Sequence, residues 1–153
     1  EKEIRIVIEV VTDEKWKKPI GDYVKAKAHF AANYYDDFSF IGFVEDNNIL
    51  AGVVFTDYDG YNIWIHLVIE HPRVITKNRI GLVMDYCFKQ LNCGRITAMC
   101  RNEYKRNERL LKAVGFIKEG IVRKSMKINN IYYDGALYGM LKNECKWMKG
   151  DKK

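Results

Sequence analysis

The stretch RLLKAVGFIKEGIVRK, residues 109–124, joins the end of a predicted helix to the start of a predicted strand. Gly115 can take the left-handed conformation that ends a helix, because it has no Cβ to clash with the backbone. Phe116 can then fold back against the last helical turn. Gly120 permits a bulge in the strand, which pairs through Asn129 and Asn130 with the last strand. The stretch therefore predicts a sharp helix-to-strand reversal followed by a terminal hairpin.

The elements around this reversal follow a regular order. Three strand-like segments, separated by the turns EDNN (45–48) and DYDG (57–60), predict an antiparallel meander. Apolar residues at helical spacing predict a helix from Asp22, and Thr76 can cap a second helix that runs to about Leu91. The full predicted order is β-α-β-β-β-α-β-α-β-β, and the third helix ends near Val114. The strands are predicted at 3–11, 38–44, 49–55, 61–70, 95–100, 121–128 and 131–141.

The composition is that of a globular protein. Of 153 residues, 48% are hydrophobic and 30% charged, and no apolar run approaches the ~20 residues that a membrane span needs. We expect a single domain over residues 1–153 with no membrane segment. The opening EKEIRIVIEV lacks the pattern of a signal peptide and the four cysteines form no C-x-x-C pair. These features favour the cytoplasm and predict no metal site.

The net charge predicts a polyanionic partner. At +6, with a pI of about 9.1, the chain should attract nucleic acid, an anionic surface or a phosphorylated cofactor, and charge alone does not choose among them. The basic runs RNEYKRNER (101–109) and VRKSMK (122–127), with tyrosines nearby for stacking, are compatible with nucleic acid. Because Glu103 and Glu108 interrupt the first run, we weigh nucleic acid below a phosphorylated ligand.

Several motifs occur in an order that resembles a known family. A helix is followed by Gly-Phe-x-x-Glu-Gly-x-x-Arg within residues 110–123, then by Asp134, by Tyr-Gly-Met at 138–140 and by Glu-Cys-x-Trp at 144–147. With the element order over residues 40–147, these motifs resemble the GNAT superfamily of acyl-CoA-dependent N-acyltransferases. The nearest types are the ribosomal-protein alanine acetyltransferases and the GNAT-like proteins of bacteriophages. The resemblance implies an α/β (α+β) fold, with a mixed, mostly antiparallel, splayed sheet of six or seven strands flanked by helices.

The resemblance also implies acetyl-CoA as the cofactor. In this family the central strand, here 61–70, presents its backbone to the pantetheine arm and the thioester. The helix that begins at Thr76 receives the pyrophosphate, and an exposed helix N-terminus favours an anion on physical grounds as well. The loop RVITKNRIG (73–81) replaces the family's glycine-rich pattern, so arginine side chains are expected to substitute. The expected cofactor-binding residues are Leu67, Val68, Ile69, Arg73, Thr76, Lys77, Asn78, Arg79, Asn107 and Leu111.

Acyl transfer to an amine needs a proton acceptor and a proton donor. Strand alternation places His66 and Glu70 on one face of the central strand, and His66 is the preferred base because its unperturbed pKa lies near neutrality. Glu70 is the second candidate base, and a structural histidine bonded within the sheet is the alternative for His66. The tyrosine that many family members use as general acid falls at Leu111. Tyr104 and Tyr138 are therefore considered as donors, with ordinary half-buried aromatics as the alternative.

These observations favour an acyl-CoA-dependent N-acyltransferase, most simply an N-acetyltransferase, that moves an acetyl group to an amine of a protein or small molecule by direct attack. The expected partners are acyl-CoA and an amine acceptor, and a homodimer stays open. The alternative is a catalytically degenerate GNAT-like binding module, phage-encoded, that acts on a host protein or nucleic acid. The transferase hypothesis requires two neighbouring strands to separate near the middle of the sheet, beside an open helix tip at Thr76.

Overall fold

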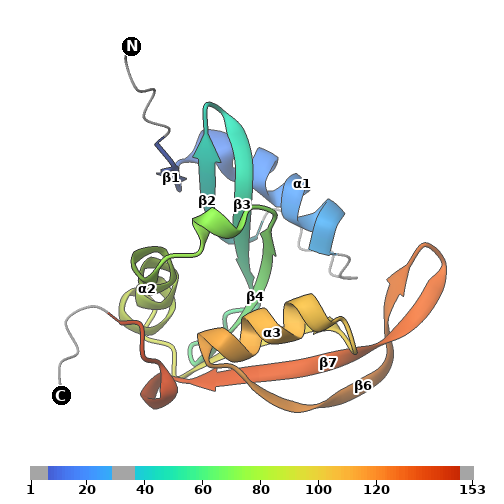
Figure 1. Ribbon diagram of the computed structural model, residues 1–153. Helices are drawn as coiled ribbons and strands as arrows, with labels where there is room; N and C mark the ends of the chain where they lie inside the picture. The colour runs from blue at the N-terminus through green and yellow to red at the C-terminus, as the bar shows by residue number, and fades with distance from the viewer. Residues whose placement is uncertain (1–6, 29–36, 149–153) are drawn as a thin grey trace.

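A mixed sheet of seven strands runs through the centre of the protein (Figure 1). The computed structural model describes residues 7–28 and 37–148. The strands are β1 (Glu9–Val11), β2 (Ser39–Glu45), β3 (Asn48–Thr56), β4 (Asn62–Ile69), β5 (Arg95–Arg101), β6 (Ile117–Ile128) and β7 (Ile131–Leu141), and the helices are α1 (Lys17–Ala28), α2 (Lys77–Asp85) and α3 (Lys105–Val114). The sheet order is β1-β2-β3-β4-β5-β7-β6, and only β4 and β5 pair in parallel. The predicted fold class is confirmed.

The tight turns of the sheet are built from Asn and Asp. Asp46 and Asn47 turn from β2 to β3 with φ of 48° and 62°, and Asn129 and Asn130 join β6 to β7 with φ of 50° and 65°. Two successive residues with positive φ give a hairpin turn whose twist matches that of the strands, and short polar side chains tolerate this conformation. The predicted meander β2-β3-β4 and the terminal hairpin are both confirmed.

Two hydrophobic cores cover the two faces of the sheet. On one face, α1 packs through Ile20 and Val24 against β2 and β3. On the other face, α2 and α3 contribute Met84 and Leu111 to a larger core. The central strand β4 is covered on both sides, and its side chains alternate between the cores, with Val68 on the α1 side. This alternation decides which β4 side chains can reach each side of the candidate site.

The helix-to-strand reversal forms as predicted. Gly115 ends α3 with φ 115° and ψ 11°, and the N–H of Phe116 donates to the Leu111 carbonyl at 2.9 Å. The Phe116 side chain is buried against the last turns of α3 in the larger core. Further along β6, Glu119 is an extra residue in the pairing with β7, which is the bulge expected beside Gly120. Both glycines mark the predicted irregularities.

Four predicted boundaries differ from the structure by more than one residue. The strand predicted at 121–128 begins at Ile117, directly after the helix cap. The first helix begins at Lys17 rather than Asp22, because Pro19 is tolerated in a first helical turn and Ile20 is buried there. The second helix ends at Asp85 and continues as one π-helical turn, Tyr86–Gln90. The first described strand spans only Glu9–Val11. Predicted structure at residues 1–6 and 29–36 lies outside the described residues.

The larger core also holds three of the four cysteines. Cys87, Cys93 and Cys100 are buried, and burial raises the pKa of Cys100 to about 11, so its thiol stays protonated at neutral pH. Over residues 7–28 and 37–148, no group of three or more His, Cys, Asp or Glu side chains is placed to hold a metal ion. Among the same residues, no helix has the length and apolar character of a membrane span.

Candidate active site

The sheet opens between its two parallel strands. The β4–β5 ladder runs from Asn62 opposite Arg95 to Ile65 opposite Ala98, and stops there. Beyond this point β4 continues to Ile69 and β5 continues to Arg101 without pairing to one another. Figure 1 shows the two halves of the sheet diverging on either side of this point. The strands therefore separate near the middle of the sheet, as the transferase hypothesis requires.

The backbone of β4 presents hydrogen-bonding groups to this opening. The Glu70 N–H donates to the Leu50 carbonyl of β3 at 3.2 Å. In an antiparallel ladder, alternate residues bond to the same neighbour, so the Val68 main chain also faces β3. The Leu67 and Ile69 main chains then face the opening, where Arg106 donates to the Ile69 carbonyl at 3.1 Å. Leu67 and Ile69, but not Val68, can offer backbone groups to a ligand there.

The tip of α2 lies on the surface beside this opening. The Thr76 hydroxyl caps the helix and accepts from the Arg79 N–H at 3.2 Å. Lys77 and Asn78 in the first turn are exposed, and within the described part of the chain their N–H groups have no hydrogen-bond partner. A helix tip of this kind attracts an anion. The helix tip is therefore open to ligand.

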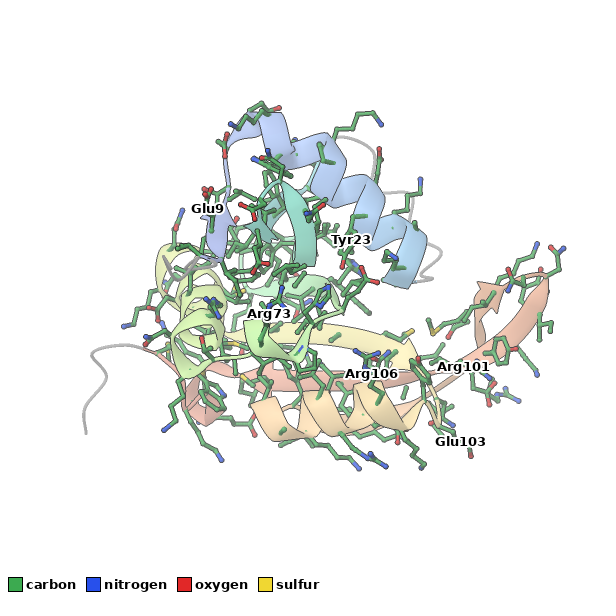
Figure 2. The ribbon with its side chains drawn as sticks, turned by 45° about the horizontal axis from the view of Figure 1, so that its top comes forward. Glu9, Tyr23, Arg73, Arg101, Glu103 and Arg106 are labelled. Atoms are coloured by element: carbon green, nitrogen blue, oxygen red, sulfur yellow. The ribbon has the colours of Figure 1, made fainter. Side chains whose placement is uncertain are left out.

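The two arginines near this tip already have partners within the chain. Arg73 pairs with Glu45 at 3.1 Å. The Arg79 guanidinium donates to the Arg73 carbonyl at 3.2 Å and so holds the turn Pro72–Val74 against the helix. Figure 2 shows Arg73 on this turn and Arg106 near the end of β4. Arg73 and Arg79 can both contribute positive charge to a phosphate, but only Arg73 is exposed.

His66 is bonded within the sheet and also lines the opening. Its Nε2 lies 2.8 Å from the Thr56 hydroxyl on β3. Burial lowers the pKa of His66 to about 4, so the ring is neutral at physiological pH. The hydrogen bond within the sheet was the alternative prediction for this residue, and the structure shows it together with access to the cavity. A neutral imidazole retains the capacity to accept a proton.

Glu70 lies at the end of β4, and both of its oxygens are occupied. The Tyr23 hydroxyl of α1 donates to Oε1 at 2.6 Å, and the Lys27 ammonium lies 3.2 Å from Oε2. These contacts, the Tyr23 hydrogen bond first, lower the pKa of Glu70. A carboxylate that is stabilised in its charged form is a weaker base. Burial weakens His66 as a base as well, so the preference for His66 rests on position, since Tyr23 and Lys27 occupy both oxygens of Glu70.

A cavity of about 750 Å³ joins most of the predicted site residues. It extends from the end of α1 across the opening to α3, so residues far apart in sequence share one wall. A smaller apolar hollow beside α2 shares Leu67, Ile69 and Leu111 with this cavity and is also lined by Arg79. The remaining predicted residues, Arg73, Thr76, Lys77 and Asn78, lie around the α2 tip. The cavity brings together His66, Leu67, Val68, Ile69, Glu70, Tyr104, Asn107 and Leu111.

The two candidate proton donors differ in their access to this cavity. Tyr104 precedes α3, is exposed, and is the one tyrosine among the described residues that line the cavity. Tyr138 on β7 is fully buried, does not line the cavity, and its hydroxyl has no partner within the described residues. Burial raises the pKa of Tyr138, and this further disfavours loss of its proton. Tyr104 is the better placed donor.

Several residues at the site were not predicted from the sequence. Thr56 bonds His66, Tyr23 bonds Glu70, and Arg106 bonds the end of β4. Arg106 falls in the basic run 101–109, which offered a signal of charge but not of position. Thr56 and Tyr23 carry no local signal, because each meets its partner only through strand pairing or helix packing.

Comparison with known proteins gives the family. The model of the GNAT acetyltransferase domain matches residues 8–137. The chain is 32% identical over 135 residues to the probable N-acetyltransferase YjcK of Bacillus subtilis, covering 85% of this chain and 73% of that protein. It is 30% identical over 114 residues to the SPbeta prophage-derived uncharacterized N-acetyltransferase YokL of the same organism, covering 71% of this chain and 64% of YokL. The chain belongs to the GNAT acetyltransferase family, as its motifs predicted.

Solved structures with low sequence identity share the fold. A spermidine N-acetyltransferase SpeG mutant from Vibrio cholerae has a TM-score of 0.72 at 14% identity, over 89% of this chain and 94% of that one. The putative acetyltransferase YncA of Salmonella typhimurium, solved with acetyl-CoA, has a TM-score of 0.65 at 12% identity, over 88% and 93%. The ribosomal-protein-S5-alanine acetyltransferase of Vibrio fischeri has a TM-score of 0.61 at 22% identity, over 88% and 73%.

The structure fits the acetyl-CoA that GNAT domains use. The main chains of Leu67 and Ile69, which do not pair with β5, suit an amide-containing arm, and the exposed tip of α2 suits a phosphate. When bound, acetyl-CoA supplies an acetyl group activated as a thioester. The protein is an acetyltransferase of a family that takes acetyl-CoA and an amine acceptor, and its own residues must position the acceptor and move the protons.

Proposed function

We propose that this protein transfers an acetyl group from acetyl-CoA to a primary amine by direct attack, in the opening between β4 and β5. The observation that carries the proposal is the end of the β4–β5 ladder at Ile65, which leaves the Leu67 and Ile69 main chains facing a cavity that also holds His66. A main-chain N–H at Leu67 or Ile69 lies where it can stabilise negative charge on the thioester oxygen.

The phosphates of acetyl-CoA are proposed to lie at the α2 tip. Lys77 and Asn78 offer backbone N–H groups there, and Thr76 and Arg79 hold the turn that shapes the tip. The segment 73–81 at this tip lacks a glycine that would let the backbone surround a diphosphate, because its one glycine, Gly81, is buried inside α2. Charge from Arg73 and Lys77 then compensates for the missing backbone contacts.

His66 is proposed as the proton acceptor. The amine nitrogen forms a bond to the acetyl carbon, the carbon–sulfur bond breaks, and the nitrogen loses a proton. His66 is neutral, so its imidazole can accept that proton directly or through a water molecule. Because the pKa of His66 is low, the ring works as a transient acceptor and passes the proton on to solvent.

Tyr104 is proposed as the donor to the departing thiolate. It lines the cavity at the start of α3, close in sequence to Asn107, which also lines the cavity. Leu111, where the resemblance suggested a general acid, is apolar and buried, so it can contribute only packing. The four-residue separation of Asn107 and Leu111 places both on one side of α3, toward the cavity.

The test measures acetyl-CoA binding by calorimetry and free thiol released on addition of amines. We expect His66→Ala to lower kcat at least about tenfold with acetyl-CoA affinity unchanged. Thr56→Val, which removes the hydrogen bond but keeps the ring, should lower kcat less. Unchanged kcat in His66→Ala would remove His66 from the proposal. Acetyl-CoA binding without thiol release from any amine would indicate instead the catalytically degenerate binding module.

A further inference from the structure

Arg101 is a half-buried basic residue on the His66 side of the sheet. It ends β5, and because Trp64 lies opposite Thr97 in the β4–β5 register, His66 and Arg101 face the same side. Its guanidinium lies 3.7 Å from the ring centroid of Tyr133 on β7. Figure 2 shows Arg101 where the β6–β7 hairpin leaves the body of the protein. A cation–π contact with the ring uses none of the guanidinium N–H groups as donors to an oxygen, so they stay available to an oxyanion.

No acidic side chain neutralises Arg101 among the described residues. Among the described residues, the charged side chains that line the cavity include a single carboxylate, Glu70, and that carboxylate is already paired with Lys27 at 3.2 Å. Two further arginines of the lining, Arg106 and Arg109, lie on α3, which packs on the opposite face of the sheet. Among the described residues that line the cavity, Arg101 is therefore the unpaired positive charge on the face that carries His66.

The hairpin beside Arg101 adds positive charge to the same region. Residues 121–133 include Arg123, Lys124 and Lys127 and no Asp or Glu, and the carboxylate of the next residue, Asp134, accepts from the Lys124 N–H at 2.9 Å. Met126 and Ile128 of this hairpin line the cavity, so the basic hairpin borders the same cavity as His66. A cleft bordered by one sign of charge concentrates ligands of the opposite sign.

We propose that Arg101 binds a carboxylate or phosphate group of the acceptor, so that the acetylated amine belongs to a molecule that also carries negative charge. This inference rests on the proposed function. A guanidinium fork that lies over the Tyr133 ring suits either oxyanion, because both accept two parallel N–H bonds. The positive charge of Arg101 and of the hairpin repels a polycation. Spermidine, which appears in the name of the SpeG acetyltransferase, should therefore be a poor acceptor for this protein.

The experiment compares amines that differ only by an acidic group. Phosphoethanolamine is paired with ethanolamine, β-alanine is paired with propylamine, and spermidine is added as the polycation. Thiol release gives kcat/KM for each amine. We expect the acidic member of at least one pair to be preferred about tenfold or more, and spermidine to be used least.

Variants of Arg101 test whether this side chain causes the preference for acidic amines. Arg101→Gln should remove the preference mainly through KM, and Arg101→Lys should retain part of it, because an ammonium keeps the charge but not the fork. Lys112→Gln, an exposed residue near the end of α3, is the matched control. Calorimetry with the protein saturated in coenzyme A adds a readout independent of turnover. It should show phosphoethanolamine or β-alanine binding to the parent protein and not to Arg101→Gln.

Three outcomes overturn the inference. The first is equal use of the acidic and neutral amines in both pairs. The second is a preference for the acidic amine that survives in Arg101→Gln. The third is loss of acetyl-CoA affinity in Arg101→Gln, which would mean that Arg101 binds the cofactor. The proposed function fails separately, through absence of thiol release from every amine. In that case calorimetry with phosphoethanolamine and β-alanine still tests whether Arg101 binds a phosphate or carboxylate group.

Discussion

The imidazole Nε2 of His66 on β4 lies 2.8 Å from the hydroxyl of Thr56 on β3. The two residues are diagonal neighbours on the face of the sheet that carries α1, because Val54 pairs with His66 and Thr56 pairs with Trp64. This contact fixes the ring at the edge of the cavity. The same burial that fixes the ring also keeps it neutral.

Acidification should destabilise the protein through His66. Burial lowers the pKa of His66 to about 4, against ~6.5 in an unfolded chain, so the unfolded state binds the proton more readily. The contribution of the neutral His66 ring to the unfolding free energy is fully present above about pH 6.5. As the pH falls toward 4, this contribution decreases by about 3 kcal/mol in all. Urea unfolding at a series of pH values should show a shallower loss for His66→Gln than for the parent protein. Parallel pH profiles would contradict this assignment.

Hydrogen exchange should distinguish alternate residues of β4. We expect the Leu67 and Ile69 amides to exchange faster than the Val68 amide, because Val68 bonds to β3 and its neighbours face the opening. Saturation with acetyl-CoA should slow Leu67 or Ile69 and leave Val68 unchanged. NMR exchange rates measure this directly, with Val68 as the internal control. Protection of all three amides in the free protein would mean that the strand is closed.

Charge reversal at the α2 tip should weaken cofactor binding. Arg79→Glu places a negative charge beside the helix tip and removes the bond that holds the Pro72–Val74 turn. We expect acetyl-CoA affinity to fall at least about tenfold, or ~1.4 kcal/mol. Lys112→Glu makes the same charge change at the far end of α3 and should have little effect in calorimetry. Equal affinities for the two variants would place the phosphates elsewhere.

The two candidate tyrosines should respond differently to loss of the hydroxyl. Tyr104→Phe removes the one tyrosine hydroxyl among the described lining residues and should lower kcat at least about tenfold. Tyr138→Phe removes a buried hydroxyl that has no partner within the described residues, so it should leave kcat unchanged and raise stability by up to about 1 kcal/mol. Steady-state kinetics and urea unfolding test both. A normal kcat in Tyr104→Phe would exclude its role as donor.

Two glycines in the reversal should differ in their tolerance of alanine. Gly115 has φ 115°, a conformation that side chains with Cβ rarely adopt, so Gly115→Ala should cost about 1–2 kcal/mol of unfolding free energy. Gly120 has no atom within 4 Å of an added Cβ and needs no positive φ. Gly120→Ala should therefore change stability by less than about 0.5 kcal/mol. Equal losses in urea unfolding would show that the left-handed cap contributes little.

Much of the fold was predictable because its signals are local. Gly115, the Asn129–Asn130 turn and the Thr76 cap each act within a few residues of chain, and each appears where the sequence placed it. The start of α1 was misplaced because Pro19 was not recognised as a residue of the first turn. Cofactor residues on β4 and α2 followed from the family motifs, and their roles stay predictions.

By itself the sequence determined the order of strands and helices, the turns between them and the family, since caps, hairpin turns and alternating apolar residues are encoded by neighbouring residues. Only the tertiary structure decided where the β4–β5 ladder ends, that Thr56 holds His66, and that Tyr133 supports Arg101. Each of these relationships joins residues far apart in the chain. Their geometry depends on strand register and on the packing of both cores, which no local pattern specifies.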